Sequence, residues 1–382
     1  MVRRGISVRF LHTADWQVGM RAAQVGEAGA RVRDERLAAA RRVVEAAKSA
    51  GAAFVLVAGD TFEDNGVDRV LVQKVADTLA GFGGPAYVIP GNHDPLVPGS
   101  VWEHPAWKSS PNLHVLREEQ PTEVPGGTLY PCPTRAKHSG KDPTAWIRPE
   151  EGRGIRIGLA HGTAEGVHQE EPDYPIPQDA AVRGGLDYLA LGHWHSTVTY
   201  VDPDGATRMA YSGTHETTKF GERDSGNALL VEILAAGAPP LNTPVRTGGL
   251  SWMSIEEELR GQGDVVRLRE RVETIAAPEV TLLDVQISGL LSPADREAVV
   301  HLEEILASRF LWARLETPRV RPSPDDENLV AGLPAGILRE AAAKLCALAD
   351  PAYAGQRPEE GSPEIASRAL LELYAILGGG GR

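Results

Sequence analysis

An apolar run that closes on a carboxylate stands at Phe54-Val55-Leu56-Val57-Ala58-Gly59-Asp60. A run of this length that ends at a glycine is typical of a central strand in a sheet covered on both faces. Asp60 then follows the carboxyl end of that strand. Because ligands and catalytic groups collect at this edge of open α/β sheets, the sequence predicts a functional site there.

Four other apolar runs end in the same way, each followed by polar side chains. Together the five predicted strands bring aspartate, asparagine and histidine to one edge of the fold. Oxygen and imidazole donors gathered in this number are typical of a metal site. The four runs are Val8–Leu11 before Asp15, Ala86–Ile89 before Asn92 and His93, Ile155–Leu159 before His161, and Tyr188–Leu191 before His193 and His195.

Helical patterns separate the first three predicted strands, at Arg31–Ser49 and Arg69–Ala80. This β-α-β-α-β order predicts a parallel sheet with right-handed crossovers. Shorter strands and turns follow from about residue 112. We therefore expect an α/β fold over residues 1–240, built as a two-sheet sandwich flanked by helices.

The remaining chain is expected to form two smaller parts. Residues 245–320 predict an α+β capping domain that includes a helix at Glu256–Ile275. Residues 321–382 predict a linker and a helical tail, whose last helix is expected at Pro363–Leu377 with Ser362 as its cap.

Composition restricts the class of protein but not its substrate. The 382 residues are 42% apolar and 24% charged, which is ordinary for globular chains. Two cysteines without metal-ligand spacing and no apolar stretch of about 18 residues predict a cytoplasmic protein without a membrane span. A net charge of −13 argues against indiscriminate coating of nucleic acid, although bound metal ions invert the local field.

The polar motifs resemble those of the calcineurin-like metallophosphoesterases. Within that superfamily, Phe10–Trp16 and Tyr211-Ser212-Gly213-Thr214 look like the SbcD-type DNA double-strand-break repair nucleases. The resemblance covers about the first 235 residues. It implies a two-sheet metallophosphoesterase sandwich and a metal-dependent DNA nuclease, acting as an exonuclease, an endonuclease or both. The motifs are Asp15, Gly59-Asp60, Gly91-Asn92-His93-Asp94, His161-Gly162 and Gly192-His193-Trp194-His195.

The resemblance also implies a role for each site residue. Two divalent ions, with Mn²⁺ the first choice and Mg²⁺ the alternative, would activate a water for attack on phosphorus. His93 looks like the family's catalytic histidine, and Asp94 is expected to orient it. One ion would be held by Asp15, Asp60 and His195, and the other by Asp60, Asn92, His161 and His193.

One position departs from the family pattern. The first motif is Asp-x-His in the family, whereas this chain has Asp15-Trp16-Gln17. A glutamine amide oxygen in place of an imidazole nitrogen predicts a first ion that is held more weakly, with activity that needs excess metal. Whether Gln17 contacts that ion stays open at this point.

Four residues are candidate substrate contacts, each with a plainer alternative. Glu63 stands where related nucleases often carry a histidine that helps to orient DNA, and His215 follows the Tyr211–Thr214 phrase. Arg135 and Lys137 lie in a basic loop that also contains acids, so a solvated loop explains them equally well. His12, inside the first strand, is expected to be a hydrogen-bonded core histidine.

The resemblance implies partners as well. These are DNA, as double-strand ends or single strands, an SMC-like ATPase of the SbcC type that would bind the tail, and a homodimer as one possible assembly. No membrane partner is expected. Two other functions stay open: a phosphodiesterase acting on nucleotides or other small phosphodiesters, and a DNA-end-binding scaffold in which Gln17 has weakened the first metal site.

Overall fold

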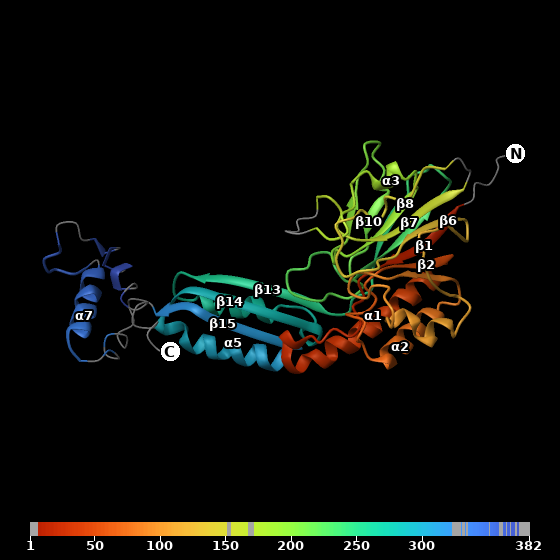
Figure 1. Ribbon diagram of the computed structural model, residues 1–382. Helices are drawn as coiled ribbons and strands as arrows, with labels where there is room; N and C mark the ends of the chain where they lie inside the picture. Colours follow the sequence, from red (N-terminus) through yellow and green to blue (C-terminus); the bar gives the residue numbers. More distant parts are fainter. Residues whose placement is uncertain are drawn as a thin grey trace. The chain divides into compact units, whose positions relative to one another are not determined.

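The computed structural model divides into two compact units, Met1–Ser251 and Trp252–Arg382, each with its own fold (Figure 1). The first unit holds both large sheets, and the second holds a small sheet and the tail. The structure describes residues 7–150, 154–166 and 172–322, and beyond them residues 330, 333, 335–350, 352–358, 362, 363, 365, 366, 368–370 and 373.

The first sheet has six strands in the order β12-β11-β1-β2-β3-β4. The first three predicted strands are its centre, and they pair in parallel as the β-α-β-α-β pattern indicated. β11 and β12 extend the sheet by antiparallel pairing on the other side of β1. The strands are β1 (Val8–Thr13), β2 (Phe54–Ala58), β3 (Ala86–Ile89), β4 (Leu113–Val115), β11 (Asn227–Ile233) and β12 (Leu241–Arg246).

The second sheet also has six strands, in the order β5-β6-β7-β8-β10-β9. Its four central strands run parallel, and both edge strands are antiparallel. Its bounds are β5 (Thr122–Val124), β6 (Gly127–Cys132), β7 (Ile155–His161), β8 (Tyr188–Gly192), β9 (Val198–Tyr200) and β10 (Met209–Tyr211).

The two sheets bury a shared apolar layer. Phe10 and Phe54 stack with ring centroids 4.9 Å apart, and Tyr188 from the second sheet meets Phe10 edge to face. Fully burying side chains of this size stabilises the fold by about 1.5–3 kcal/mol each. α1 (Gly29–Ser49) and α2 (Arg69–Ala80) cover the outer face of the first sheet (Figure 1). The predicted two-sheet α/β sandwich is therefore confirmed.

Short helices link these elements. The start of α2 is marked by a capping residue. The Asp68 carboxylate accepts the backbone N–H of Val70 and so caps α2. The short helices of the first unit are η1 (Ala23–Ala28), η2 (Val101–Glu103), η3 (Pro105–Lys108) and α3 (Ala180–Arg183).

The strand β12 lies beyond residue 240, where we expected the first domain to end. It pairs with β11 from Asn227 opposite Arg246 to Glu232 opposite Leu241, so it belongs to the first unit. The proline- and glycine-rich segment before it is a connection within the sheet. Among the described residues, no helix has the length and apolar character that crossing a bilayer requires.

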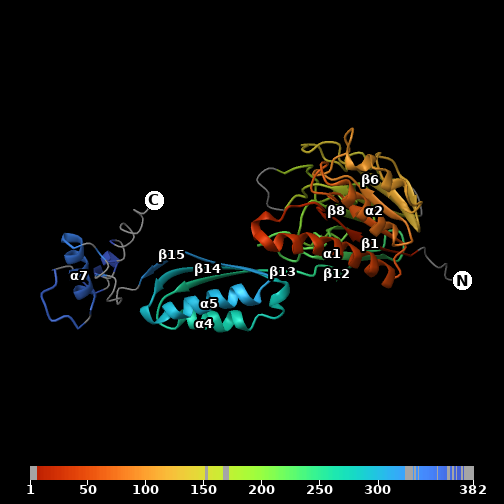
Figure 2. The same ribbon diagram turned by 90° about the horizontal axis from the view of Figure 1, so that it is seen from below.

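The second unit contains a three-stranded sheet with two helices on one face (Figure 2). Residues Glu256–Leu259 belong to its first strand, so the helix expected at Glu256–Ile275 is wrong over this part. The elements are β13 (Ser251–Leu259), α4 (Asp264–Glu273), η4 (Pro278–Val280), β14 (Thr281–Leu291), η5 (Pro293–Asp295), α5 (Arg296–Arg309) and β15 (Trp312–Pro322).

Leu268, Leu302 and Val285 lie in the apolar layer between these helices and the sheet. In the tail, α7 (Ile337–Ala349) agrees with the predicted helical tail, whereas the helix expected at Pro363–Leu377 lies partly outside the described residues.

Candidate metal centre

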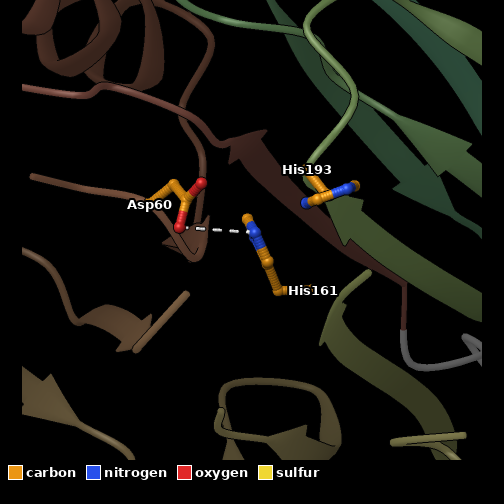
Figure 3. Close-up of side chains that lie close together, drawn as sticks. All are labelled: Asp60, His161 and His193. Atoms are coloured by element: carbon orange, nitrogen blue, oxygen red, sulfur yellow. Dashed lines mark ion pairs between the residues drawn. The ribbon is translucent and has the colours of Figure 1, made fainter. Parts of the chain in front are cut away.

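Three side chains from separate strands form a compact group at the carboxyl ends of both sheets (Figure 3). Asp60 follows β2, His161 ends β7 and His193 follows β8. One ligand atom from each lies within 4.8 Å of the others. The convergence that the strand ends predicted is therefore present, and it spans the two sheets.

Asn92 completes this group through direct contacts. Its Oδ1 lies 2.8 Å from His161 Nε2 and 3.0 Å from His193 Nδ1. His161 Nε2 is also 3.4 Å from Asp60 Oδ1. The structure thus brings together all four residues expected around the second ion, which we call the second donor set.

The orientation of His161 comes from the main chain. Its Nδ1 lies 2.8 Å from the carbonyl oxygen of Ala58, so Nδ1 carries the hydrogen and Nε2 faces Asp60. Burial lowers the pKa of His161, but the Asp60 carboxylate outweighs burial and raises that pKa to about 9. His193 has the opposite shift, because burial and the neighbouring His161 lower its pKa to about 4.

Asp60 is held in a tight turn. It has a φ of 48°, a conformation that L-residues rarely adopt, and its Oδ1 accepts the backbone N–H of His93 at 2.9 Å. Two neighbouring positions require glycine because a side chain there would collide with the donor residues. A Cβ at Gly91 would lie 2.1 Å from Asp60 Oδ1, and one at Gly59 would lie 2.4 Å from His161 Nδ1. The glycines of the motifs therefore allow the donors to approach one another.

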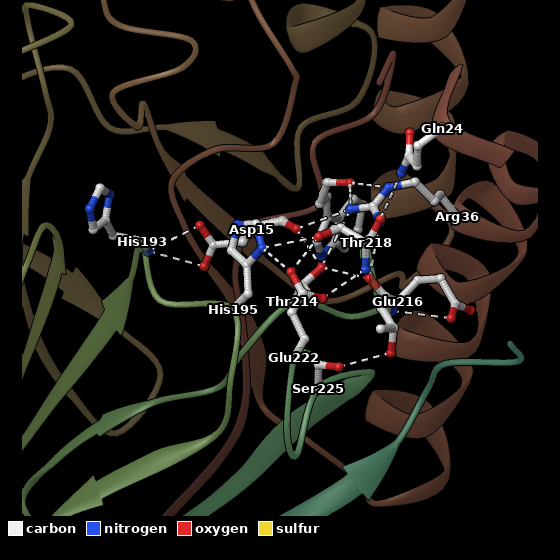
Figure 4. A network of polar contacts seen from close by, with 12 residues as sticks. Asp15, Gln24, Arg36, His193, His195, Thr214, Glu216, Thr218, Glu222 and Ser225 are labelled. Atoms are coloured by element: carbon white, nitrogen blue, oxygen red, sulfur yellow. Dashed lines mark hydrogen bonds and ion pairs between the residues drawn. The ribbon is translucent and has the colours of Figure 1, made fainter. Parts of the chain in front are cut away.

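Asp15 and His195 were expected, with Asp60, around the first ion. Together with Gln17, whose contact with that ion the sequence left open, they form what we call the first donor set. Both carboxylate oxygens of Asp15 accept the backbone N–H of His193, each at 3.0 Å. Burial raises the pKa of Asp15 to about 6. The His195 ring lies beside this carboxylate (Figure 4). Gln17 lines the adjoining cavity, and its backbone N–H donates to the carbonyl oxygen of Asp60 at 2.9 Å.

His195 is oriented by a residue that the sequence did not single out. Its Nδ1 lies 2.6 Å from Glu222 Oε1 and 3.2 Å from Thr218 Oγ1. Burial lowers the pKa of His195, but the hydrogen bond to Glu222 outweighs it, so the pKa is raised. No local motif marks Glu222, which stands in a polar loop 27 residues after its partner.

Arg36 is a second residue that sequence reasoning missed. It is buried on α1, and its guanidinium donates to the carbonyl oxygens of Asp15, Trp16 and Glu216. Thr214 Oγ1 adds a hydrogen bond to the carbonyl oxygen of Asp15 at 2.7 Å. The Tyr211–Thr214 phrase therefore supports the loop that carries Asp15.

His93 and Asp94 have separate partners. His93 Nδ1 lies 2.9 Å from the carbonyl oxygen of Glu63. Asp94, which we expected to orient His93, instead accepts the backbone N–H groups of Phe62 at 2.9 Å and Gly91 at 2.7 Å. Burial, with the nearby Asp60 carboxylate, raises the pKa of Asp94 to about 8. Asp94 thus ties together the loops that carry Asp60 and Asn92.

Three of the four candidate substrate residues lie away from the cavity. His215 is buried, stacks on Trp16 at 5.1 Å and places Nε2 2.8 Å from the carbonyl oxygen of Arg36. The bridge between Ala14 and Thr214 draws it inward, so the expected substrate contact is wrong. Arg135 is exposed and pairs with Glu118 at 2.9 Å.

Lys137 is also exposed and does not line the cavity, whereas Glu63 does. His12 is a buried core histidine, as expected, with Nδ1 2.9 Å from the Tyr188 hydroxyl.

A cavity of about 670 Å³ opens beside the donors. It adjoins His93, which was expected to act in catalysis, and its wall includes the loop that holds His195. Its lining consists of Gln17, Met20, Gln24, Glu63, His93, His193, Trp194, His195, Ser196, Thr218, Lys219, Phe220, Gly221 and Glu222.

Residues 8–197 match the family profile of the calcineurin-like phosphoesterases. The chain is 30% identical over 176 residues to the "Uncharacterized metallophosphoesterase YhaO" of Bacillus subtilis strain 168. That match covers 44% of this chain and 42% of the relative, so the chain spans less than half the length of the curated relative that it matches.

Two solved structures resemble this chain at low sequence identity. The protein TT1561 of Thermus thermophilus is 13% identical with a TM-score of 0.40, and covers 63% of this chain and 99% of its own. A dimetal phosphatase from Danio rerio is 11% identical with a TM-score of 0.36, and covers 62% and 98%.

The donor atoms of both sets fit divalent cations. With the hydrogen of His161 on Nδ1, the Nε2 lone pair faces Asn92 Oδ1 and Asp60 Oδ1. Lone pairs that face one another repel, and a proton or a divalent cation between them removes that repulsion. Carboxylate, amide and imidazole donors together suit hard and borderline divalent ions. The sites that the sequence predicted are therefore chemically suited to their ions.

Proposed function

We propose that this protein is a metal-dependent phosphodiesterase that hydrolyses DNA, as the SbcD-type nucleases do. The observation that carries the proposal is the cavity in which His93 adjoins donors from both sets. Phosphodiester hydrolysis needs charge stabilisation on the phosphoryl oxygens and a proton for the leaving oxygen. This cavity has residues suited to both tasks.

The donor residues and His93 would divide the work. Asp15, Asp60 and His195 would hold one cation, and Asp60, Asn92, His161 and His193 the other, with Mn²⁺ as the preferred ion. Two divalent cations supply Lewis acidity at phosphorus and lower the pKa of water. His93 donates through Nδ1 to the carbonyl oxygen of Glu63, which leaves Nε2 for the substrate. A ring that carries a second hydrogen on Nε2 would pass it to the leaving oxygen and keep the Nε2 lone pair.

Two observations lead us to propose DNA rather than a small ester as the substrate. The phrases Phe10–Trp16 and Tyr211–Thr214 resemble those of SbcD-type nucleases, and Thr214 supports the loop of Asp15. The cavity wall also includes Lys219 and Phe220, a cation and an aromatic ring suited to a phosphate and a base. Two cations bring +4 against −2 from Asp15 and Asp60, so an acidic chain still attracts a polyanion at this site.

A small phosphodiester is the second candidate substrate. The cavity volume of about 670 Å³ falls within the range of about 300–1,000 Å³ that is typical of small-molecule sites. A nucleotide would occupy such a cavity without the longer contacts that DNA makes. The two candidates therefore predict different ratios of activity on polymers and on small esters.

The deciding experiment compares substrates for one purified protein. Duplexes with defined ends, single strands and plasmid are incubated with Mn²⁺ or Mg²⁺, beside bis-p-nitrophenyl phosphate and cyclic nucleotides. The nuclease proposal predicts degradation of DNA ends that disappears in His93→Ala. Turnover of the small esters alone supports the second candidate. DNA binding without any turnover supports instead a scaffold with a weakened first site.

An SMC-like ATPase is the proposed partner, with the tail beyond residue 320 as its binding segment. Such a partner would position DNA ends for the nuclease domain. The same assay, run with and without the ATPase, checks this: a partner of this kind raises DNA degradation and leaves small-ester hydrolysis unchanged. Equal rates on DNA in both conditions contradict it.

A further inference from the structure

We propose that Glu222 is a positioning residue that holds the His195 ring as a ligand of the first cation. The inference rests on the two-cation site and is independent of which phosphodiester is cleaved. It concerns the loop Thr217–Ser225, which carries Glu222 and none of the metal-binding motifs in the sequence.

Glu222 is itself fixed at both carboxylate oxygens. Oε1 lies 2.6 Å from His195 Nδ1 and accepts the Thr218 hydroxyl, and Oε2 accepts the backbone N–H of Thr218 at 2.8 Å. Its side chain is 5% exposed. A carboxylate held by three donors keeps one orientation, so the histidine that it contacts is held as well.

The contact determines which ring atom of His195 is available for a metal. With its hydrogen donated from Nδ1 to Glu222, the ring keeps its lone pair on Nε2. The ring lies between Glu222 and Asp15, with Glu222 on the Nδ1 side (Figure 4). A carboxylate behind a ligating histidine fixes the tautomer and ring orientation and makes the histidine a stronger donor.

The two histidines that serve different cations are supported in different ways. His161 donates to a backbone carbonyl, that of Ala58, whereas His195 donates to a carboxylate. A carboxylate strengthens its partner more than a neutral carbonyl does because it carries a full charge. The first donor set has Gln17 where the family has histidine, so Glu222 offsets part of that loss.

The Glu222 loop also forms part of the cavity wall. Thr218 to Glu222 all line the cavity, and Gln24 Nε2 donates to the carbonyl oxygen of Thr218 at 3.4 Å. The loop therefore has two tasks, framing the substrate cavity and holding His195. Glu222 contributes to the second task through its carboxylate, which a substitution can remove while the loop backbone stays.

The test is calorimetric titration of the metal-free full-length protein with Mn²⁺, without substrate. Glu222→Ala is expected to weaken one of two binding events by roughly 10–100-fold and leave the other unchanged. Glu222→Gln, which keeps an acceptor for Nδ1–H, is expected to recover much of that affinity. In a His195→Ala background, Glu222→Ala is expected to have no further effect.

Asp224→Asn is the matched control. Asp224 is an exposed acid in the same loop with a φ of 51°, which asparagine tolerates, so this change removes a charge without straining the backbone. Two unchanged binding events in Glu222→Ala, equal weakening of both, or the same change in Asp224→Asn would overturn the proposal. If Glu222→Ala does not fold, Glu222→Gln decides: weakening of one event supports the proposal, and weakening of both contradicts it.

Discussion

The second donor set consists of side chains that contact one another, whereas the first consists of side chains held by their surroundings. Asn92 Oδ1 meets both His161 and His193 directly. In the first set, Asp15 is held by a backbone N–H and His195 by Glu222. The second set is thus shaped by the strand ends themselves, and the first depends on contacts from neighbouring loops. We expect the two cations to differ in affinity for this reason.

Asn92→Ala should have the largest effect, because it removes the oxygen shared by two histidines of the second set. Removing a residue that only supports a ligand already costs about 10–100-fold in metal affinity or activity, so loss of a ligand should cost more than about 100-fold. Hydrolysis assays and Mn²⁺ calorimetry measure this. Asn92→Asp keeps an oxygen donor and should retain two binding events. Full activity in Asn92→Ala would remove the basis for the second site.

Gly91→Ala tests whether close approach shapes the second set. The added Cβ would lie 2.1 Å from Asp60 Oδ1, so the carboxylate or the loop must move. A displacement of about 1 Å at a reacting centre costs up to about 100-fold in rate. Steady-state kinetics give the effect. At Gly140, a Cβ meets no atom of the described chain within 4 Å, so Gly140→Ala should leave the rate unchanged.

Gln17→His should narrow the difference between the two sets. It restores the imidazole that the family carries, and we expect affinity for the weaker Mn²⁺ to rise by about tenfold, the lower end of the effects seen around metal sites. Calorimetry of the parent and variant measures both affinities. Gln178→His, an exposed substitution, controls for adventitious binding by an added histidine. Two equally tight sites in the parent would contradict the premise.

The buried His12 gives a pH effect that belongs to neither donor set. Burial lowers its pKa from 6.5 to about 3. As the pH falls below 6.5, the unfolded chain binds a proton that the folded protein refuses, so stability falls. Through His12 alone, the free energy of unfolding should fall by about 1.4 kcal/mol for each pH unit between about pH 6 and about pH 4.

The free energy of unfolding is measured with denaturant, in the presence of a chelator, for the parent and for His12→Gln. It should depend less steeply on pH in the variant. Exposed His301→Gln serves as the control, with the slope of the parent.

Local sequence patterns predicted the structure correctly where a residue's environment depends on its neighbours in the chain. The run Phe54–Asp60 predicted both a buried strand and a donor at its end, and α2 has the bounds that its apolar spacing predicted. The pattern failed at Glu256–Leu259. Ile255 and Leu259 are four residues apart and buried, as on a helix, and glutamates favour helices. Pairing of β13 with β14 nevertheless makes this segment a strand.

The donors of the metal centre were determined by the sequence, because each follows an apolar run and the carboxyl ends of such strands meet. The supports of those donors were decided only by the tertiary structure. Arg36 and Glu216 lie 180 residues apart, and no periodicity relates them. Asp94 does not orient His93 but accepts a backbone N–H from the loop after Asp60. Glu222 contacts His195 from a separate loop. A hydrogen bond depends on where two groups lie in space, and spacing along the chain predicts that only within one element or motif.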